Sequence, residues 1–155
     1  MSSSSKSCVF CQNKVQENCF LESENFLAIY NLAPILPGHS MVIPKIHHQS
    51  LMELSDFELS EMMIFARKTV KLLMKAFSVN AFNWTIQEGI EAGQTVPHLH
   101  LHLIPRAEKD LPQPGDWYPL LKASEEETID SEARPKHSYE EIAQISEKLR
   151  VFNLS

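Results

Sequence analysis

The sequence predicts one α+β domain. Three observations support this prediction: strand-like segments joined by turn residues, one long amphipathic helix, and a stretch in which histidine and leucine alternate. At 155 residues the chain is long enough to bury a core, and 43% hydrophobic with 22% charged residues is typical of a globular protein. We therefore expect a single domain over residues 8–155, preceded by a disordered, serine-rich tail at 1–7.

The first two strands are predicted on either side of a proline and glycine turn. Residues 25–31 are rich in apolar and aromatic side chains, and residues 40–44 are a second apolar run. Pro37 and Gly38 break the chain between them. Asn31 and His39 should therefore bracket the connection and meet at one rim of the sheet.

A long helix is predicted after residue 55. Ser55 and Glu58 have the spacing of a capping box. Apolar residues then follow at steps of three and four, at Leu59, Met63, Ala66, Val70, Leu73 and Phe77. The basic residues of this helix, Arg67, Lys68, Lys71 and Lys75, are predicted to form its solvated face.

A further hairpin should contain the histidines. Residues 81–87 have the aromatic and β-branched content of a strand, and a loop with Gly89 and Gly93 leads from them to the histidine stretch. Beyond Arg106, proline-rich and acidic segments predict mobile loops over 107–137. A second capping box predicts a C-terminal helix over 138–150.

The histidine stretch is the most informative part of the chain. In a strand, alternate side chains point to opposite faces, so His98, His100 and His102 should lie on one face, opposite three leucines. Imidazole, with a pKa of about 6.5, acts as nucleophile, acid or base near neutral pH. A purification tag would lie at a terminus without alternating leucines, so we interpret the row as a catalytic face and not as a tag or a chance polar face.

The spacing of the histidines favours nucleophilic chemistry. His98 and His102 should lie about 13 Å apart at about 3.3 Å per residue, which is too far to share one metal ion. We therefore predict that His100, at the centre, is a nucleophile that attacks phosphorus. Backbone amides near Gly89 and Gly93, with Gln94 and Thr95, could cradle phosphate oxygens, although glycines of this kind also serve turns alone.

Charge and hydropathy exclude some partners. A net charge of −6 disfavours nonspecific nucleic-acid binding. An anionic ligand would need a locally positive pocket, for which Lys45 and Arg106 are candidates beside the histidines. No apolar run approaches the roughly 18 residues of a membrane span, and the first residues lack the apolar core of a signal peptide. We expect a cytoplasmic protein.

Two of the three cysteines suggest a metal site. Cys8 and Cys11 have the spacing of half a tetrahedral zinc site. Two further ligands would have to come from His47, His48 or the triad histidines. A pair of buried thiols and a redox pair are the alternative interpretations. Cys19 has no predicted role.

These motifs resemble those of the histidine triad superfamily. The run from His98 to Ile104 matches its pattern, and the segments at 87–96 and 105–106 look most like the fragile histidine triad branch, the dinucleoside polyphosphate hydrolases. The similarity covers about residues 25–118. It implies a five-stranded antiparallel sheet with one long helix and a homodimer.

The resemblance also implies roles for individual residues. His100 would take the α-phosphoryl group of a nucleotide, and water would then release a nucleoside monophosphate. The other catalytic residues implied are His98, His102 and His39. The substrate-binding residues implied are Asn31, Gln87, Gln94, Thr95 and Tyr118.

The cysteine pair departs from the familiar animal members of that branch. Many microbial triad proteins and the galactose-1-phosphate uridylyltransferases carry such a pair. The resemblance to them implies a structural zinc ion bound by Cys8, Cys11, His47 and His98. No carboxylate cluster in the sequence predicts a dedicated magnesium site. Any Mg²⁺ would therefore arrive bound to the polyphosphate substrate.

Two other functions compete with dinucleotide hydrolysis. A nucleoside phosphoramidase would use the same His100 intermediate, although its familiar members continue with a glycine pair where this chain has Pro105 and Arg106. A nucleotide-binding signalling module would use the same pocket with only incidental turnover. The sequence does not determine the base or the number of phosphates.

Overall fold

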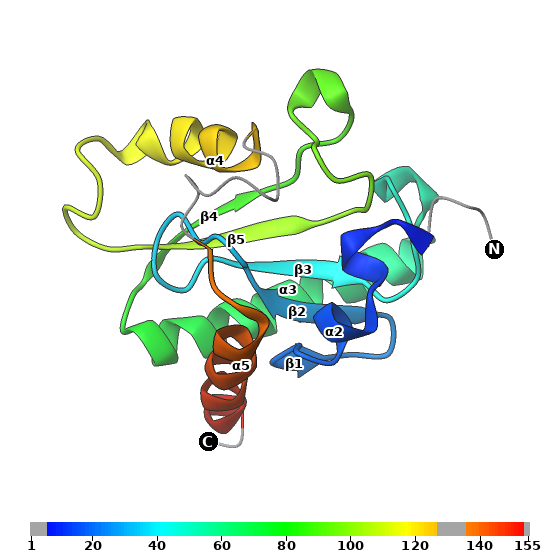
Figure 1. Ribbon diagram of the computed structural model, residues 1–155, viewed down its shortest axis with the longest axis horizontal. Coiled ribbons are helices and arrows are strands. Elements are labelled where there is room, and N and C mark those ends of the chain that lie inside the picture. The colour runs from blue at the N-terminus through cyan, green and yellow to red at the C-terminus, as the bar shows by residue number, and fades with distance from the viewer. Residues whose placement is uncertain (1–5, 127–135, 154–155) are drawn as a thin grey trace.

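The centre of the structure is a five-stranded antiparallel sheet (Figure 1). The structure is a computed structural model that describes residues 6–126 and 136–153. The strands are β1 (Leu21–Glu22), β2 (Phe26–Tyr30), β3 (Ser40–Pro44), β4 (Ala81–Thr85) and β5 (Leu101–Arg106), in the order β1-β2-β3-β5-β4. The α+β prediction is confirmed. This order places β5 in the interior of the sheet. His102 lies on β5, whereas His98 and His100 precede it, so the strand begins three residues later than the histidine stretch predicted.

The pairing of β2 with β3 brings the two predicted rim residues together. The register runs from Phe26 opposite Pro44 to Tyr30 opposite Ser40. One step further, the backbone N–H of Asn31 donates to the carbonyl oxygen of His39 at 2.9 Å. Asn31 and His39 therefore face each other where the two strands meet the connecting turn, as predicted.

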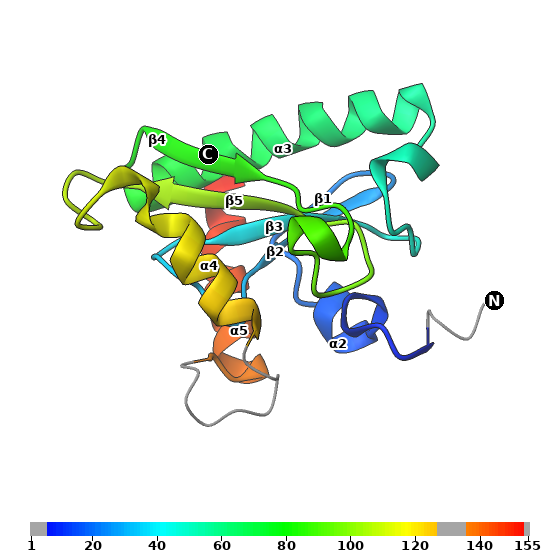
Figure 2. The same ribbon diagram turned by 90° about the horizontal axis from the view of Figure 1, so that it is seen from above.

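The helix α3 (Asp56–Phe77) covers one face of the sheet (Figure 2). Its capping box is present, because the hydroxyl of Ser55 accepts from the N–H of Glu58 and the Glu58 carboxylate accepts from the N–H of Ser55. This arrangement satisfies donors that a helix start leaves unpaired.

The buried stripe of α3 differs from the predicted one. Leu59 and Met63 are 37% and 48% exposed. The buried residues are Met62, Phe65, Ala66, Thr69, Val70, Leu72 and Leu73. Two apolar stripes overlap on this helix, and helical spacing alone does not decide which one faces the sheet.

The helix α4 (Trp117–Glu126) corrects the prediction of loops over 107–137. It follows η4 (Pro114–Asp116), a 3₁₀ turn. Pro119 lies in the first turn of α4, where a helix tolerates a missing N–H, so the proline-rich sequence did not prevent a helix. Residues 127–135, and 1–5 of the predicted tail, lie outside the described residues.

The C-terminal helix α5 (Tyr139–Asn153) begins at its predicted capping box and continues three residues past the predicted end. The carboxylate of Glu141 accepts from the N–H of Ser138, and the Ser138 hydroxyl accepts from the N–H of Glu141. Ile142 and Leu149 are buried in the same core as α3.

The two faces of the sheet pack against different apolar clusters. Leu99, Leu101 and Leu103 are buried in the core beneath α3. The opposite face carries a smaller apolar cluster that includes Phe10 and Ile29, and both α2 and α4 lie on this side (Figure 2). The short helical elements are η1 (Val9–Cys11), α2 (Asn13–Gln16), η2 (Leu51–Glu53) and η3 (Ile90–Ala92). No helix in the described ranges is long and apolar enough to cross a membrane.

Candidate active site and metal cluster

His100 is buried and oriented by the backbone. Its Nδ1 lies 2.7 Å from the carbonyl oxygen of His98. A carbonyl only accepts, so Nδ1 carries the proton and Nε2 holds the lone pair. Burial, together with the neighbouring His102, lowers the pKa of His100 to about 3. The imidazole is therefore neutral at physiological pH, as a nucleophile must be.

His102 is linked to His39. Nε2 of His39 lies 2.9 Å from Nδ1 of His102, and both rings are buried. The N–H of Ile35 donates to Nδ1 of His39, so a neutral His39 carries its proton on Nε2 and donates it to His102. Neutral His102 then carries its own proton on Nε2. It can donate that proton to an oxygen bound beside His100.

Asn31 packs beside His39. Its Oδ1 accepts from the N–H of Ala33 at 2.9 Å, and its Nδ2 lies 3.3 Å from Nε2 of His39, where both groups are donors, so this contact adds no hydrogen bond to the His39–His102 pair. Its side chain is buried. The structure thus places Asn31 against His39, while its predicted contact with substrate remains a prediction.

The other four predicted substrate-binding residues line one pocket. This polar pocket has a volume of about 370 Å³. Its lining includes Gln87, Gln94, Thr95 and Tyr118, together with Ile90, Glu91, Gly93 and Lys122. Tyr118 and Lys122 come from α4 and lie four residues apart, so they share one face of that helix. Lys122 was not predicted, because its segment was expected to be a loop.

Two glutamines of the polar pocket differ in how their side chains are used. Oε1 of Gln94 accepts from the N–H of Gly89, and its Nε2 donates to the carbonyl oxygens of Gln49 and Val96. The side chain of Gln94 therefore cross-links the loop in which it lies. Gln87 is only 8% exposed, and its Oε1 is buried without a partner among the described residues.

The two predicted cationic residues are both engaged elsewhere. The guanidinium of Arg106 donates to both carboxylate oxygens of Asp110, and also to Asn83 and the carbonyl oxygen of Pro114. Arg106 thereby ties β4 and β5 to the segment that precedes α4. Lys45 pairs with Glu22 at 3.1 Å. Neither residue supplies the positive pocket for which it was a candidate.

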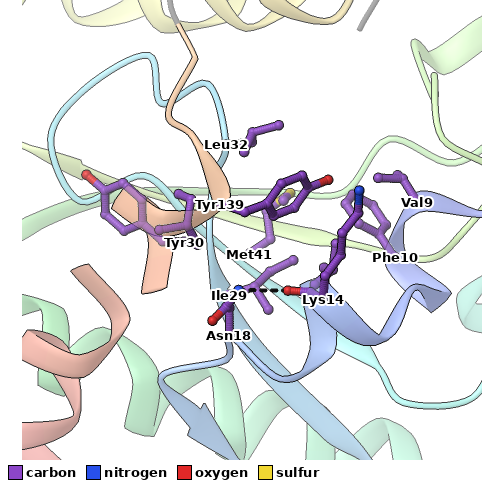
Figure 3. Close-up of a pocket in the computed structure, with 11 residues that line it drawn as sticks. Val9, Phe10, Lys14, Asn18, Ile29, Tyr30, Leu32, Met41 and Tyr139 are labelled. Carbon is purple, nitrogen blue, oxygen red and sulfur yellow. Dashed lines mark hydrogen bonds between the residues drawn. The ribbon is translucent and has the colours of Figure 1, made fainter. Parts of the chain in front are cut away.

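A second, apolar pocket lies over β2 and β3 (Figure 3). Ile29 of β2 and Met41 of β3 form its floor, and the ring of Phe10 contacts both this pocket and His100, at 5.3 Å between centroids. Tyr139 of α5 completes the lining, with the ammonium of Lys14 4.2 Å from its ring centroid. The catalytic face is therefore flanked by one apolar and one polar pocket.

The predicted metal ligands converge. The ligand atoms of Cys8, Cys11, His47 and His98 all lie within 4.8 Å of one another. Nδ1 of His98 lies 3.4 Å and 3.5 Å from the two sulfur atoms, and Nδ1 of His47 lies 3.3 Å from Cys11 Sγ. His48, the alternative ligand, pairs instead with Glu53.

The chemistry of these four residues fits Zn²⁺. Donors bound to one tetrahedral zinc at about 2.1 and 2.3 Å lie about 3.6 Å apart, close to the observed separations. Nε2 of His98 lies 3.1 Å from the carbonyl oxygen of Pro44, which leaves Nδ1 for a metal. Burial, with the contact to Cys8, raises the pKa of Cys11 to about 11, so the thiolate form requires a bound cation.

Comparison with known families agrees with this arrangement. The family model of the HIT domain matches residues 12–109, which include strands β1 to β5 and the histidines His98, His100 and His102. This chain belongs to the HIT family.

This HIT protein is similar to two relatives whose names state an activity. It is 38% identical over 120 residues to the bis(5'-nucleosyl)-tetraphosphatase [asymmetrical] of Schizosaccharomyces pombe, covering 77% of this chain and 66% of that protein. It is 33% identical over 135 residues to the bis(5'-adenosyl)-triphosphatase of Dictyostelium discoideum, and this match covers 87% of this chain and 85% of that protein.

A solved structure of the family also bears on the metal cluster. The zinc-bound histidine triad family protein of Mycobacterium smegmatis superposes on this HIT protein with a TM-score of 0.68. The two chains are 27% identical, and the match covers 96% of this chain and 94% of that one. The HIT fold of this chain thus has a zinc-bound counterpart.

Proposed function

We propose that this HIT protein hydrolyses dinucleoside polyphosphates and releases a nucleoside monophosphate. The observation that carries the proposal is the hydrogen bond from His100 Nδ1 to the carbonyl oxygen of His98, which leaves Nε2 as a neutral nucleophile. The two relatives named as dinucleotide hydrolases support the choice of substrate over a phosphoramidate.

The first step forms a bond between Nε2 of His100 and the α-phosphorus. The bond between that phosphorus and the bridging oxygen breaks, and the nucleoside polyphosphate leaves as an anion whose departing oxygen accepts a hydrogen bond from Nε2–H of His102. His100 then carries positive charge while its Nδ1–H remains bound to the His98 carbonyl oxygen, which stabilises that charge. Water attacks the same phosphorus in the second step, and the P–N bond breaks. Nε2 of His100 recovers its lone pair, and the excess proton of the water passes to solvent with release of the nucleoside monophosphate.

The pockets suggest how the substrate lies. A nucleobase would pack in the apolar pocket against Phe10, Ile29 and Met41. The remaining phosphates and the second nucleoside would extend into the polar pocket. Asn31, Gln87, Gln94, Thr95 and Tyr118 remain our candidates for substrate contacts.

Product analysis tests the activity. Wild-type protein and His100→Asn are mixed with diadenosine tri- and tetraphosphate and with an adenosine phosphoramidate, in water enriched in oxygen-18. We expect wild type to release AMP from the dinucleotides, with the label in AMP, and the variant to release none. Turnover of the phosphoramidate alone would identify a phosphoramidase, and binding without turnover would favour a signalling module.

We also propose that Cys8, Cys11, His47 and His98 hold a structural zinc ion. Zinc would anchor the N-terminal segment to the sheet and, with four protein ligands, would leave no position for substrate. Mg²⁺ carried by the polyphosphate and a cytoplasmic location remain predictions from the sequence.

A homodimer is part of the proposal. In the described sheet, β4 is an edge strand whose one neighbour is β5, and Trp84 on it is 40% exposed. Such an edge presents backbone donors and acceptors to a second strand. Light scattering during size-exclusion chromatography should give twice the monomer mass, and Trp84→Glu should reduce it to the monomer.

A further inference from the structure

The polar pocket and the apolar pocket lie on opposite sides of the nucleophile. The floor of the apolar pocket comes from β2 and β3, whereas Gln87 of the polar pocket follows directly after β4. Because β5 lies between β3 and β4, the histidines separate the two pockets. The last pair of the register joins Thr85 to His102, and Gln87 and His100 lie two residues beyond it on their own segments. A chain of phosphates that leaves His100 on the side away from the base therefore enters the polar pocket.

The helix α4 brings a positive charge to that pocket. Lys122 is the one cationic residue among its lining residues, and Glu91 on the η3 loop is the one anionic residue. Arg106 donates a hydrogen bond to the carbonyl oxygen of Pro114, the first residue of the 3₁₀ turn η4 that leads into α4.

We infer that Lys122 is a specificity-determining residue that binds the phosphates beyond the α-phosphate, and that Glu91 opposes it. This inference rests on the proposed hydrolysis of dinucleoside polyphosphates. Each added phosphate brings negative charge to the polar pocket, so the contribution of Lys122 should increase with phosphate number. A phosphoramidate, which carries nothing beyond the α-phosphate except a small amine, should not depend on Lys122.

The test compares Lys122→Gln, Lys122→Arg and Glu91→Gln with wild type. We expect Lys122→Gln to lower kcat/KM for diadenosine tetraphosphate roughly fivefold, the size of one exposed charge contact, and for the triphosphate by less. Glu91→Gln should raise kcat/KM for both dinucleotides, and Lys122→Arg should retain the wild-type kcat/KM. Lys71→Gln, on the solvated face of α3, is the matched control and should have no effect.

Nucleotide binding gives a readout that does not require turnover. Titration calorimetry in the His100→Asn background should show weaker binding of ATP after Lys122→Gln, with AMP binding unchanged. An equal loss for AMP and ATP, or equal loss for all substrates, would show that Lys122 only supports the fold and would overturn the inference. If the ratio of kcat/KM for diadenosine tetraphosphate to that for the triphosphate is the same in Lys122→Gln and wild type, the inference is overturned as well. Failure of the proposed function would appear separately, as absence of turnover by wild type.

Discussion

The carbonyl oxygen of His98 lies 2.7 Å from Nδ1 of His100, while the ring of His98 lies within 3.5 Å of both Cys8 and Cys11. One residue therefore connects the metal cluster to the nucleophile, through its side chain on one side and its backbone on the other. Any change that displaces the His98 ring should also change the orientation of His100.

Loss of a cysteine ligand should affect both metal content and catalysis. We expect wild-type protein to contain one zinc ion per chain, and Cys8→Ser to lower zinc affinity by roughly 100-fold or more. The melting temperature should fall, and kcat should fall with it because His98 is no longer anchored. Elemental analysis and thermal melting test this, with Cys19→Ser as the control. Equal zinc content in Cys8→Ser and wild type would contradict the assignment.

Replacement of His100 should separate chemistry from binding. His100→Asn removes the nucleophile but keeps a polar side chain of similar reach, so we expect kcat to fall by at least about 10³-fold with little change in affinity. Single-turnover kinetics and calorimetry with the same dinucleotide measure the two effects. A fall in affinity that accounts for the lost rate would argue against a nucleophilic role.

The lowered pKa of His100 should make stability depend on pH. Its pKa is about 3 in the folded protein and about 6.5 in an unfolded chain, so between these values the unfolded state binds a proton that the folded state does not. The free energy of unfolding should therefore fall as the pH drops below about 6.5, by up to about 1.4 kcal/mol per pH unit from this group. It should level off above that pH.

Urea denaturation at pH 5 and pH 7 measures this effect. The same comparison in His100→Asn cancels the contributions of the metal ligands, which the two proteins share. We expect the variant to lose less stability than wild type between the two pH values. Identical losses would mean that His100 is protonated in the folded protein.

Arg106 should control the position of α4. Arg106→Gln removes hydrogen bonds to Asp110, Asn83 and Pro114, and such charge-assisted bonds contribute about 1.5–3 kcal/mol each in favourable cases. We expect faster hydrogen exchange in α4 and a higher KM for dinucleotides, through Tyr118 and Lys122. Arg106→Lys should not restore the wild-type behaviour, because an ammonium cannot make the paired contact with Asp110.

The exposed ion pair between Lys109 and Glu108 offers a matched control in the same loop. Exposed pairs contribute little, so Lys109→Gln should leave α4 exchange and KM unchanged. Equal effects of the Lys109 and Arg106 changes would mean that the loop, and not the Arg106 contacts, positions α4.

Local patterns predicted much of the fold. The apolar runs at 25–31 and 40–44 became β2 and β3, and both capping boxes start helices, because these signals act over a few neighbouring residues. The helix α4 was missed since its sequence resembles a loop, and the contact from Arg106 to Asn83 that helps hold this region joins residues 23 positions apart. Lys122 was missed with it.

The sequence alone predicted that the three leucines of the histidine stretch would enter the core and that the histidines would face away from it, because side chains alternate in extended backbone. Only the tertiary structure showed that the strand itself begins at Leu101, after His98 and His100. It also supplied two thiols and enough imidazoles for a zinc site. The cysteine spacing left His47 and His48 open and the family resemblance implied His47, which the tertiary structure places beside Cys11. Only the tertiary structure decided which nitrogen of each catalytic histidine carries a proton. Those choices depend on partners such as Cys11, His39 and Ile35, and folding alone brings these partners within hydrogen-bonding distance.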